Sequence, residues 1–210
     1  MADLKFYTNP HSRGQIIRWM LEEVGQPYDT EILTYDGTLK DDAYRAINPM
    51  QKIPAIVHRG KVVTEVAAIC LYRADAGPDA GLAPPPAERA DYYRWTFFAS
   101  GPVEAAFTNK SAGWEPDAEK QRMFGYGSFD RAIDTLETAV SGKRFIAGDK
   151  FSAADVVVGS TIGFMLMFKL LDPRPAFTAY LASVTDRDAY RRGKQIDEQA
   201  TAETVSQQAS

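Results

Sequence analysis

The chain reads NPMQKIPAI from residue 48 to residue 56, which places Pro54 at the start of a short β-type run. Proline at such a position either lies at a sheet edge or takes the cis form in a tight turn. In the cis form, the N–H and C=O of Ile53 would face outward and could pair with an extended peptide as an added strand. On spacing alone, the trans form of Pro54 at a strand edge is an equal alternative.

Upstream of this run, two short strand-like segments flank one helical segment. Leu4–Tyr7 is β-type, and residues 13–24 place apolar side chains on one helical face. Gly25 supplies a stop, and residues 29–34 alternate as a second strand. Two strands that bracket a helix form a βαβ unit, so we expect these strands to be parallel.

Downstream, residues 53–57 and 62–64 are β-branched runs separated by His58-Arg59-Gly60-Lys61. This spacing, with a glycine for the turn, predicts a hairpin. Residues 65–76 return to a helical pattern, whose inward candidates are Ala68, Ile69 and Tyr72.

Residues 77–86 are rich in glycine and proline and cannot continue a helix, which indicates a linker at 78–86. Every later segment is helical in pattern. The expected helices cover residues 87–106, 118–140, 153–171, 176–184 and 187–195, with a frayed tail from Gln199. The sequence therefore predicts an α/β domain over residues 1–77 followed by an all-α domain over residues 87–210.

Composition excludes several classes of function. The 24 basic and 28 acidic residues of this 210-residue chain give a net charge of −4, which favours neither nucleic acid nor an anionic membrane surface. One cysteine, Cys70, and two histidines are too few for a disulfide framework or a metal cluster. The apolar stretch 156–171 is interrupted by polar residues, and the start lacks a signal-peptide pattern, so we expect a cytoplasmic protein.

Three loops of the first domain carry candidate site residues at one sheet edge, where α/β sheets bind ligands. Ser12 lies at a helix start, where its hydroxyl and the first-turn N–H groups could hold an anion such as a thiolate. Thr64-Glu65-Val66 opens another helix, whose N–H groups could bind a carboxylate while Glu65 receives an ammonium group. The alternative for both loops is helix capping alone.

Phe151-Ser152-Ala153-Ala154-Asp155 opens the most apolar helical segment. Serine followed three residues later by an acidic residue is typical of a capping box. We interpret this motif as a folding signal without a catalytic role.

In this order and spacing, the motifs identify a resemblance to the soluble glutathione transferases over nearly the whole chain. It is carried by Ser12-Arg13, Asn48-Pro49 with Lys52-Ile53-Pro54-Ala55, Thr64-Glu65 with Ala68-Ile69 and Tyr72, and the 152–155 box. The resemblance implies a thioredoxin-like N-terminal domain (β-α-β-α-β-β-α), an all-helical C-terminal domain, a homodimer and glutathione as cosubstrate. The first loop is most similar to theta, zeta and related bacterial forms of the serine type.

The resemblance also implies roles for individual residues. Ser12 takes the position of the hydroxyl that stabilises the glutathione thiolate. Pro54 matches the family's cis proline, and the backbone of Ile53 would pair with the cysteinyl part of glutathione. The remaining glutathione contacts would come from Glu65 and Val66 at the γ-glutamyl group and from Lys40 and Lys52 at the glycyl carboxylate.

Two features depart from the family pattern. Val66 stands where a serine hydroxyl usually binds the γ-glutamyl carboxylate, so one hydrogen bond is missing. The first loop lacks the cysteine of the thiol-reactive classes, which disfavours disulfide exchange. Tyr7 and His11 are alternative donors to the thiolate, and we prefer Ser12 because it lies at the helix start.

The expected activity is detoxifying transfer of glutathione to an apolar electrophile, with no metal. Aromatic residues of the helical half, namely Phe98, Phe107 and Trp114, are the candidates for the electrophile pocket, although core or dimer contacts are the alternative for each. Other functions open to this fold are a glutathione-dependent isomerase or dehalogenase, or a non-catalytic binding module. We interpret Cys70 as a buried, inert thiol.

Overall fold

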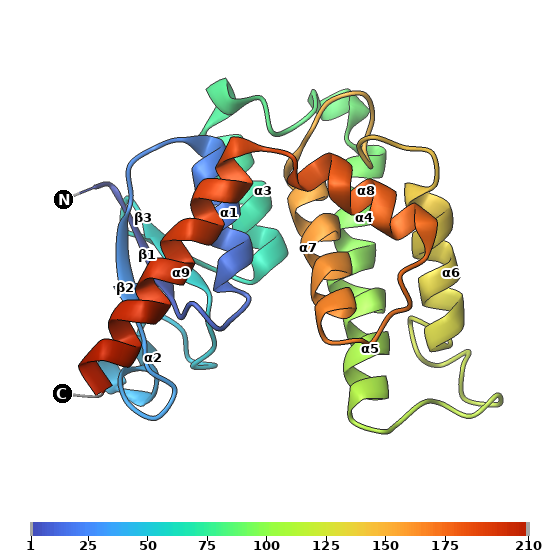
Figure 1. The fold of residues 1–210 in the computed structure, drawn as a ribbon, viewed down its shortest axis with the longest axis horizontal. Helices are drawn as coiled ribbons and strands as arrows, with labels where there is room; N and C mark the ends of the chain where they lie inside the picture. The colour runs from blue at the N-terminus through green and yellow to red at the C-terminus, as the bar shows by residue number, and fades with distance from the viewer. Residues whose placement is uncertain (1, 209–210) are drawn as a thin grey trace. The chain divides into compact units, whose positions relative to one another are not determined.

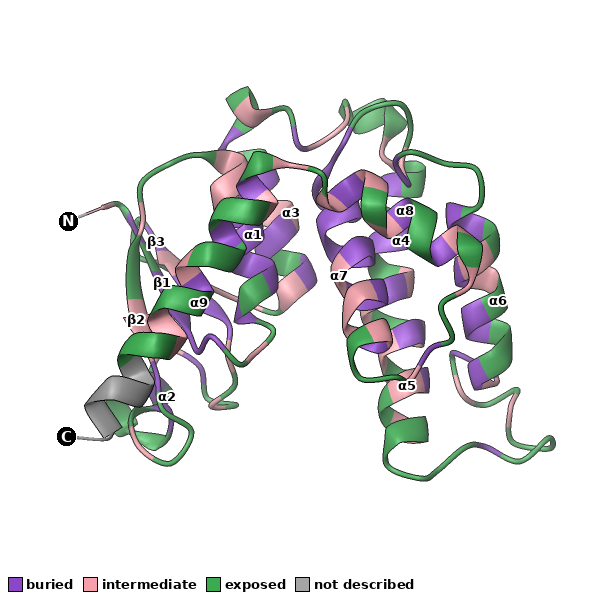
Figure 2. Cartoon of the chain, viewed as in Figure 1, coloured by how far each residue is buried: buried purple, intermediate pink, exposed green. Residues whose placement is uncertain are grey.

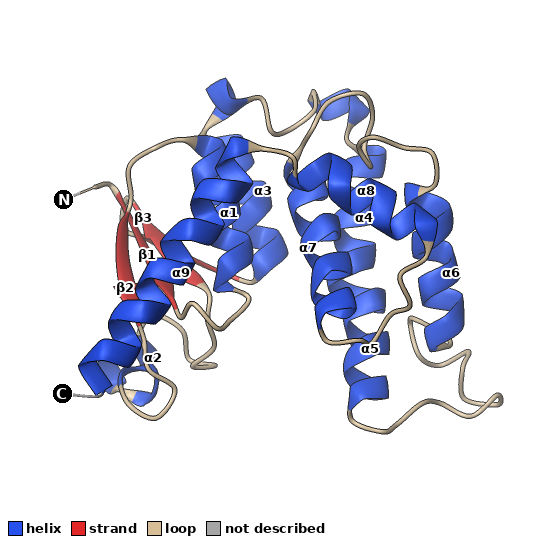
Figure 3. Cartoon of the chain, viewed as in Figure 1, coloured by secondary structure: helices blue, strands red, loops and turns tan. Residues whose placement is uncertain are grey.

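The computed structural model describes residues 2–208, with side chains through residue 203. The chain forms two compact units, Met1–Leu82 together with Arg187–Ser210, and Ala83–Asp186. We call these the sheet unit and the helical unit; Figure 3 shows the strands of the sheet unit in red and the helices of both units in blue. The sheet-plus-helix class predicted for the first part and the helical class predicted for the second are both confirmed.

The sheet unit is built on four strands in the order β2-β1-β3-β4. These are β1 (Leu4–Thr8), β2 (Asp29–Ile32), β3 (Ala55–His58) and β4 (Lys61–Thr64). The β1 and β2 strands are parallel, as the βαβ pattern predicts, although β2 ends two residues earlier than expected. The β3–β4 pair is the predicted antiparallel hairpin, and β3 also pairs antiparallel with β1.

Helices cover both faces of this sheet (Figure 1). The α1 helix (Gly14–Val24) buries Ile16, Ile17, Met20 and Leu21, and it ends at Gly25 in the left-handed region, as predicted. The α3 helix (Val66–Ala76) packs beside α1. Opposite them, the short α2 (Asp42–Arg45) follows a 3₁₀ turn at Thr38–Lys40. Ala68 of α3 is exposed, contrary to its predicted inward position.

The last helix, α9 (Asp188–Gln208), packs against α1 within the sheet unit. The Trp19 and Tyr190 rings meet edge to face at 4.9 Å, and Arg187 holds Glu23 through two hydrogen bonds of 2.6 and 2.7 Å. A side chain on Gly193 would lie 3.3 Å from the backbone nitrogen of Trp19, so glycine permits this close approach. From the sequence we expect this helix in the second domain, whereas its contacts group it with the sheet.

A buried polar cluster joins β3 to α3. The His58 Nδ1 atom lies 2.8 Å from the Tyr72 hydroxyl and 3.3 Å from Nη1 of Arg73. Arg73 is 1% exposed, and its Nη2 donates to Gln26. Burial, and then the positive charges of Arg73 and Arg59, lower the pKa of His58 below its usual value, while Asp3 opposes this shift.

We therefore expect the stability of the protein to fall as the pH decreases from 7 to 5. The unfolded His58 binds a proton near pH 6.5, before the folded one does, so its contribution is full above that pH and is lost below it. Urea midpoints at pH 7.5, 6.5, 5.5 and 5.0 measure this. The His58→Gln variant should show a flatter profile, and parallel profiles of the two proteins would contradict the assignment.

The helical unit contains four main helical runs. The first combines α4 (Ala90–Phe98), a π-helical turn (Ala99–Val103) and α5 (Glu104–Ser111) without a break. It is followed by α6 (Phe129–Val140), α7 (Ala153–Met167) and α8 (Pro175–Thr185). Residues 153–159 are buried on every side of α7, because α4, α8 and the π-helical turn pack around it, whereas Ser160, Gly163 and Met167 leave one face of its second half less buried. Figure 2 accordingly draws α7 in purple and pink.

Three predicted helix boundaries are wrong. The helix expected from residue 118 begins at Phe129, because Ser128 caps it and Gly113 and Gly127 turn the preceding loop in the left-handed region. The α7 helix ends at Met167 rather than at residue 171. The chain from Gln199 continues as helix to Gln208, although we expect a frayed tail.

The predicted capping box is confirmed at the start of α7. The carboxylate of Asp155 accepts hydrogen bonds from the Ser152 N–H at 2.9 Å and the Ser152 hydroxyl at 3.1 Å. It also accepts from the Ile146 N–H at 2.7 Å and from the Tyr180 hydroxyl at 2.8 Å. Burial raises the pKa of Asp155, and these donors oppose the rise. Asp155 therefore joins three segments of the core.

Among the described residues, no helix is both long enough and apolar enough to cross a membrane. In the same part of the chain, no group of three or more His, Cys, Asp or Glu side chains is arranged to hold a metal ion. Cys70 is buried, and burial raises the pKa of its thiol well above the usual range.

Candidate active site

The strand register brings the predicted loops to one end of the sheet. Tyr7 pairs with Ala55, and Ala55 pairs with Thr64, so the carboxyl end of β1, the start of β3 and the end of β4 lie in one row. Thr8 also pairs with Ile32 at the end of β2. The loops that carry Ser12, Lys40, Lys52, Pro54 and Glu65 all leave the sheet from this row. Sheet pairing therefore gathers the predicted glutathione residues.

Ser12 lies at the start of α1, where its hydroxyl is held from two sides. The hydroxyl donates to the Asn9 carbonyl at 2.7 Å, and its oxygen accepts from the Gly14 N–H at 2.9 Å. The helix begins at Gly14 with Arg13 as the N-cap residue, so Ser12 caps from one position earlier than usual. The side chain is half-buried.

The two alternative thiolate donors lie in different surroundings. Tyr7 is buried in a cluster with Leu33, Leu39, Tyr44 and Ala55, on the α2 side of the sheet. Its neighbour Phe6 contacts Arg18 of α1 instead, as alternation along a strand requires. The Tyr7 hydroxyl therefore lies on the face opposite α1. His11 is exposed, and its N–H donates to Oδ1 of Asn9.

The Ile53–Pro54 bond is cis, as the resemblance implies. Two side chains fix the preceding carbonyl of Lys52: the Tyr44 hydroxyl donates at 2.6 Å and Nδ2 of Asn48 at 2.8 Å. Burial raises the pKa of Tyr44 to about 12, so its hydroxyl stays a donor at neutral pH. Within the described part of the chain, neither the N–H nor the C=O of Ile53 makes a hydrogen bond. This backbone pair is available to an extended peptide.

Glu65 occupies the N-cap position of α3 with φ at 67° and ψ at 124°, a conformation that side chains rarely adopt. Its side chain is exposed and makes no capping hydrogen bond, so capping does not explain it. Val66 is the first residue of α3, and its N–H belongs to the first turn, where backbone donors have no partner within the helix. Among the residues that the structure describes, the Glu65 carboxylate has no partner, and it lies beside the unpaired N–H groups of the first turn of α3.

Both predicted lysines lie at the surface. Nζ of Lys40 is 3.4 Å from Asp36, an exposed pair that contributes little to stability. The Lys52 side chain is exposed, while its backbone carbonyl is held by Tyr44 and Asn48. The ammonium group of Lys40 thus has a carboxylate beside it, and both lysines belong to the connection between β2 and β3.

The three aromatic residues predicted for the electrophile pocket belong to the helical unit. Phe98 ends α4, is half-buried and meets Trp95 edge to face at 5.7 Å. Phe107 is half-buried on α5. Trp114 follows α5 in a loop, is 43% exposed and packs on Phe124 at 5.0 Å. Each aromatic residue retains exposed surface.

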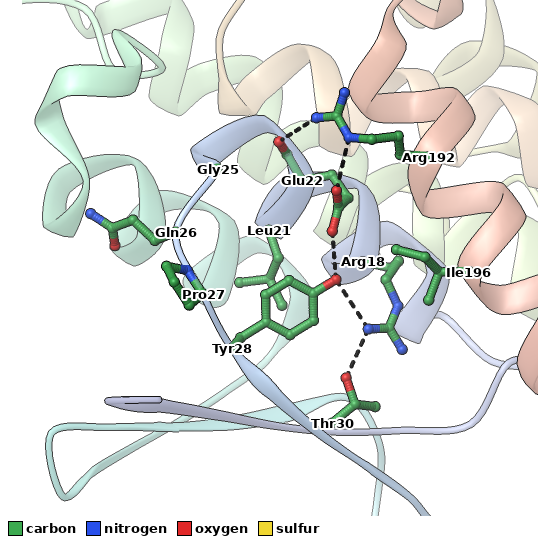
Figure 4. A pocket seen from close by; sticks show the side chains of 10 residues that line it. All are labelled: Arg18, Leu21, Glu22, Gly25, Gln26, Pro27, Tyr28, Thr30, Arg192 and Ile196. Carbon is green, nitrogen blue, oxygen red and sulfur yellow. Dashed lines mark hydrogen bonds and ion pairs between the residues drawn. The ribbon is translucent and has the colours of Figure 1, made fainter. Parts of the chain in front are cut away.

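The sheet unit also contains an open pocket of about 640 Å³ that involves none of the predicted residues. In Figure 4, Arg18 of α1 donates to the Tyr28 hydroxyl and to Thr30, and the Tyr28 hydroxyl donates to Glu22, which binds Arg192 of α9. Burial raises the pKa of Tyr28 to about 12. Because these polar groups satisfy one another, we assign this network to the docking of α9.

The comparisons with known families agree with this arrangement. Residues 12–76 match the model of the glutathione S-transferase N-terminal domain, and residues 104–183 match that of the glutathione S-transferase C-terminal domain. A probable glutathione S-transferase of Oryza sativa subsp. japonica, GSTU6, is 31% identical over 163 residues, which cover 70% of this chain and 68% of the relative. The chain belongs to the glutathione S-transferase family.

Other members are similar over more of their length. Glutathione S-transferase A of Pleuronectes platessa is 28% identical over 188 residues, 82% of each chain. The crystal structure of a glutathione transferase from Methylococcus capsulatus superposes with a TM-score of 0.77 at 27% identity, covering 93% of this chain and 98% of that one. The Phanerochaete chrysosporium transferase URE2P6, solved with oxidized glutathione, shares the fold at 20% identity and a TM-score of 0.77, over 94% and 97% of the two chains.

The motifs locate the loops of this glutathione S-transferase, but they do not predict the supporting contacts of Tyr44, Asn9 and Asn48. Tyr44 had no local signal, because a tyrosine on a short helix is an ordinary core residue. Asn9 and Asn48 each precede a proline and hydrogen-bond within their own loop. An asparagine before a proline is a turn signal that could have identified both.

Proposed function

We propose that this chain is a glutathione transferase of the serine type, which activates glutathione as a thiolate for attack on an apolar electrophile. One observation carries the proposal. The register places Ser12, the unpaired backbone of Ile53 and the free carboxylate of Glu65 on loops that leave one end of the sheet. Family membership supplies glutathione as the ligand for that end.

Ser12 stabilises the charge of the nucleophile and does not itself attack. A free cysteine-type thiol has a pKa of about 8.5, so only a few per cent is thiolate at neutral pH. The Ser12 hydroxyl and the start of α1 together could lower that pKa by about 2 units. In a substitution, the thiolate sulfur forms a bond to the electrophilic carbon, and the leaving group departs with the electron pair of the bond that breaks. In an addition, the sulfur forms the same bond, the π electron pair moves onto the electrophile, and the resulting anion takes up a proton from water.

The remaining residues bind the ends of glutathione. Glu65 receives the γ-glutamyl ammonium group, and the Val66 N–H donates to the γ-glutamyl carboxylate. The Ile53 backbone, next to Pro54, pairs with the cysteinyl residue as an added strand. Lys40 and Lys52 supply positive charge for the glycyl carboxylate. The exposed lysines bind through charge alone, so we expect their share of the affinity to weaken with salt.

Several finer features belong to the same proposal. We assign the chain to the theta- and zeta-like bacterial forms, acting in detoxification as a cytoplasmic homodimer. Within the predicted division into residues 1–77, linker 78–86 and residues 87–210, the first part binds glutathione and the helical unit supplies surface for the electrophile, while α9 packs within the sheet unit. Phe98, Phe107 and Trp114 supply apolar surface for the electrophile.

One observation favours a second candidate function. Val66 removes the side-chain hydroxyl that would bind the γ-glutamyl carboxylate, which costs about 1 kcal/mol of affinity for glutathione. A module that no longer binds glutathione and instead binds a protein partner would tolerate this change. An isomerase or dehalogenase would instead use glutathione without consuming it.

A pH titration of the thiolate absorbance at saturating glutathione decides between these functions. The transferase proposal predicts a midpoint well below about 8.5. No thiolate signal together with no heat of binding would instead support the non-catalytic module. Turnover of haloalkanes or maleyl compounds without net loss of glutathione would identify the isomerase or dehalogenase.

Replacing Glu65 by alanine should weaken glutathione binding about tenfold or more, because a charged hydrogen bond is lost. Alanine has the same Cβ as glutamate at this positive φ, so the variant changes the side chain without relieving the backbone. Calorimetric titration measures the effect. Glu198→Ala removes an exposed carboxylate of α9 and serves as the matched control. Equal affinities of the two variants would show that the γ-glutamyl site is misplaced.

A further inference from the structure

Asn9 is a buried polar residue between β1 and Ser12 that the proposed mechanism has not used. It is 8% exposed, and both the nitrogen and the oxygen of its side-chain amide make hydrogen bonds. Nδ2 donates to the Leu33 carbonyl at 2.8 Å, and Oδ1 accepts from the His11 N–H at 2.9 Å. The side chain therefore ties the loop that carries Ser12 to the residue that follows β2.

The backbone of Asn9 holds Ser12 directly. Its carbonyl accepts from the Ser12 N–H at 3.1 Å and from the Ser12 hydroxyl at 2.7 Å. The Gly14 N–H donates to the same hydroxyl oxygen at 2.9 Å. The oxygen is thus fixed in space by its carbonyl acceptor and its N–H donor.

A serine hydroxyl has one proton, so it cannot serve the Asn9 carbonyl and a thiolate at once. Rotation about the Cβ–Oγ bond redirects the proton from the carbonyl to a ligand and leaves the bond from Gly14 in place. The donor is effective only if the oxygen already lies where the sulfur will be. Its position depends on the loop backbone, which the Asn9 side chain fixes.

Only an amide of this length fits both contacts. It needs an acceptor toward His11 and a donor toward Leu33, and asparagine has one of each. Aspartate lacks the donor, and serine is too short to reach the Leu33 carbonyl. The pattern resembles an Asx turn, in which the side chain substitutes for a turn of backbone.

We propose that Asn9 is a positioning residue that sets the pKa of the glutathione thiol through Ser12. This inference rests on the proposed role of Ser12 as the donor to the thiolate. Asn9 does not contact the reacting atoms in this assignment. It acts by holding the hydroxyl that does.

The test compares the pKa of bound glutathione in Asn9→Ala, Ser12→Ala and the double variant, measured by thiolate absorbance at saturating glutathione. We expect Asn9→Ala to raise that pKa by about one unit, which is about tenfold less thiolate well below the midpoint. In the Ser12→Ala background the same change should have no further effect, because the hydroxyl it positions is gone. Asn109→Ala is the matched control. It removes a half-buried amide that donates a hydrogen bond to the Tyr126 hydroxyl in the helical unit, and it should leave the pKa of bound glutathione unchanged.

Asn9→Ser keeps an acceptor for the His11 N–H and covers the case in which the alanine variant does not fold. Its expected pKa lies between those of the wild type and Ser12→Ala. A wild-type pKa in the folded Asn9 variants, with Ser12→Ala raised, overturns the positioning role alone. A Ser12→Ala variant with the wild-type pKa overturns the proposed function of Ser12 and this inference with it.

Discussion

Replacing Ser12 by alanine should lower kcat/KM about 10- to 100-fold at pH 6.5, with glutathione affinity nearly unchanged. The variant loses the hydroxyl donor to the thiolate but keeps the start of α1, so the pKa of the thiol rises toward its free value of about 8.5. The loss should diminish as the pH rises and vanish above about pH 9, where the thiol ionises without help. Steady-state kinetics from pH 6 to 9.5 would show this convergence.

Ser12→Thr keeps a hydroxyl on the same backbone and is the matched control for this experiment. It should retain most of the activity at pH 6.5, because the donor remains. An alanine variant with the wild-type rate, or a deficit that is independent of pH, would remove Ser12 from its assigned role. Tyr7→Phe should leave the pH profile unchanged, since the Tyr7 ring packs on the α2 side of the sheet.

Replacing Asp155 by alanine should reduce the free energy of unfolding by about 3–5 kcal/mol. The carboxylate is fully buried and accepts four hydrogen bonds, from the Ile146 N–H, the Ser152 N–H and hydroxyl, and the Tyr180 hydroxyl. Alanine leaves all four donors buried without an acceptor. Urea unfolding followed by circular dichroism measures the change.

Asp130→Ala is the matched control, because Asp130 also lies in the first turn of a helix, α6, but is exposed. It should cost less than about 1 kcal/mol, the size of a surface charge effect at a helix start. A small loss of stability in both variants would mean that the capping box contributes little to the fold.

Much of the sheet unit could be predicted because its signals are local. The short β-type run of β1, the glycine that ends α1 and the hairpin turn at residues 58–61 each occupy a few adjacent positions. The loop before α6 could not be predicted. Phe124 lies at helical spacing from the apolar residues of α6, although the residues around it form turns. The docking of α9 depends on Arg18 and Asp197, which lie far apart in sequence and give no periodic signal.

In the candidate site, too, the local motifs could be predicted and the contacts between distant residues could not. Ser12, Pro54 and Glu65 were predicted because their motifs are short and their order along the chain is informative. The contacts of Tyr44 and Asn9 were not predicted, since each depends on a backbone carbonyl whose position exists only in the folded chain. The unusual backbone of Glu65 was likewise invisible, because glutamate has no preference for a positive φ.

The docking of α9 has a consequence for the order of events during protein synthesis. Arg187, Arg192 and Asp197 pair with Glu23, Glu22 and Arg18, residues made more than 160 positions earlier. While the ribosome is still making the helical unit, Arg18 lacks its carboxylate partner and α1 lacks the helix that covers one side. The sheet unit is synthesised first, but its packing is completed only when α9 is added, after the helical unit has emerged from the ribosome.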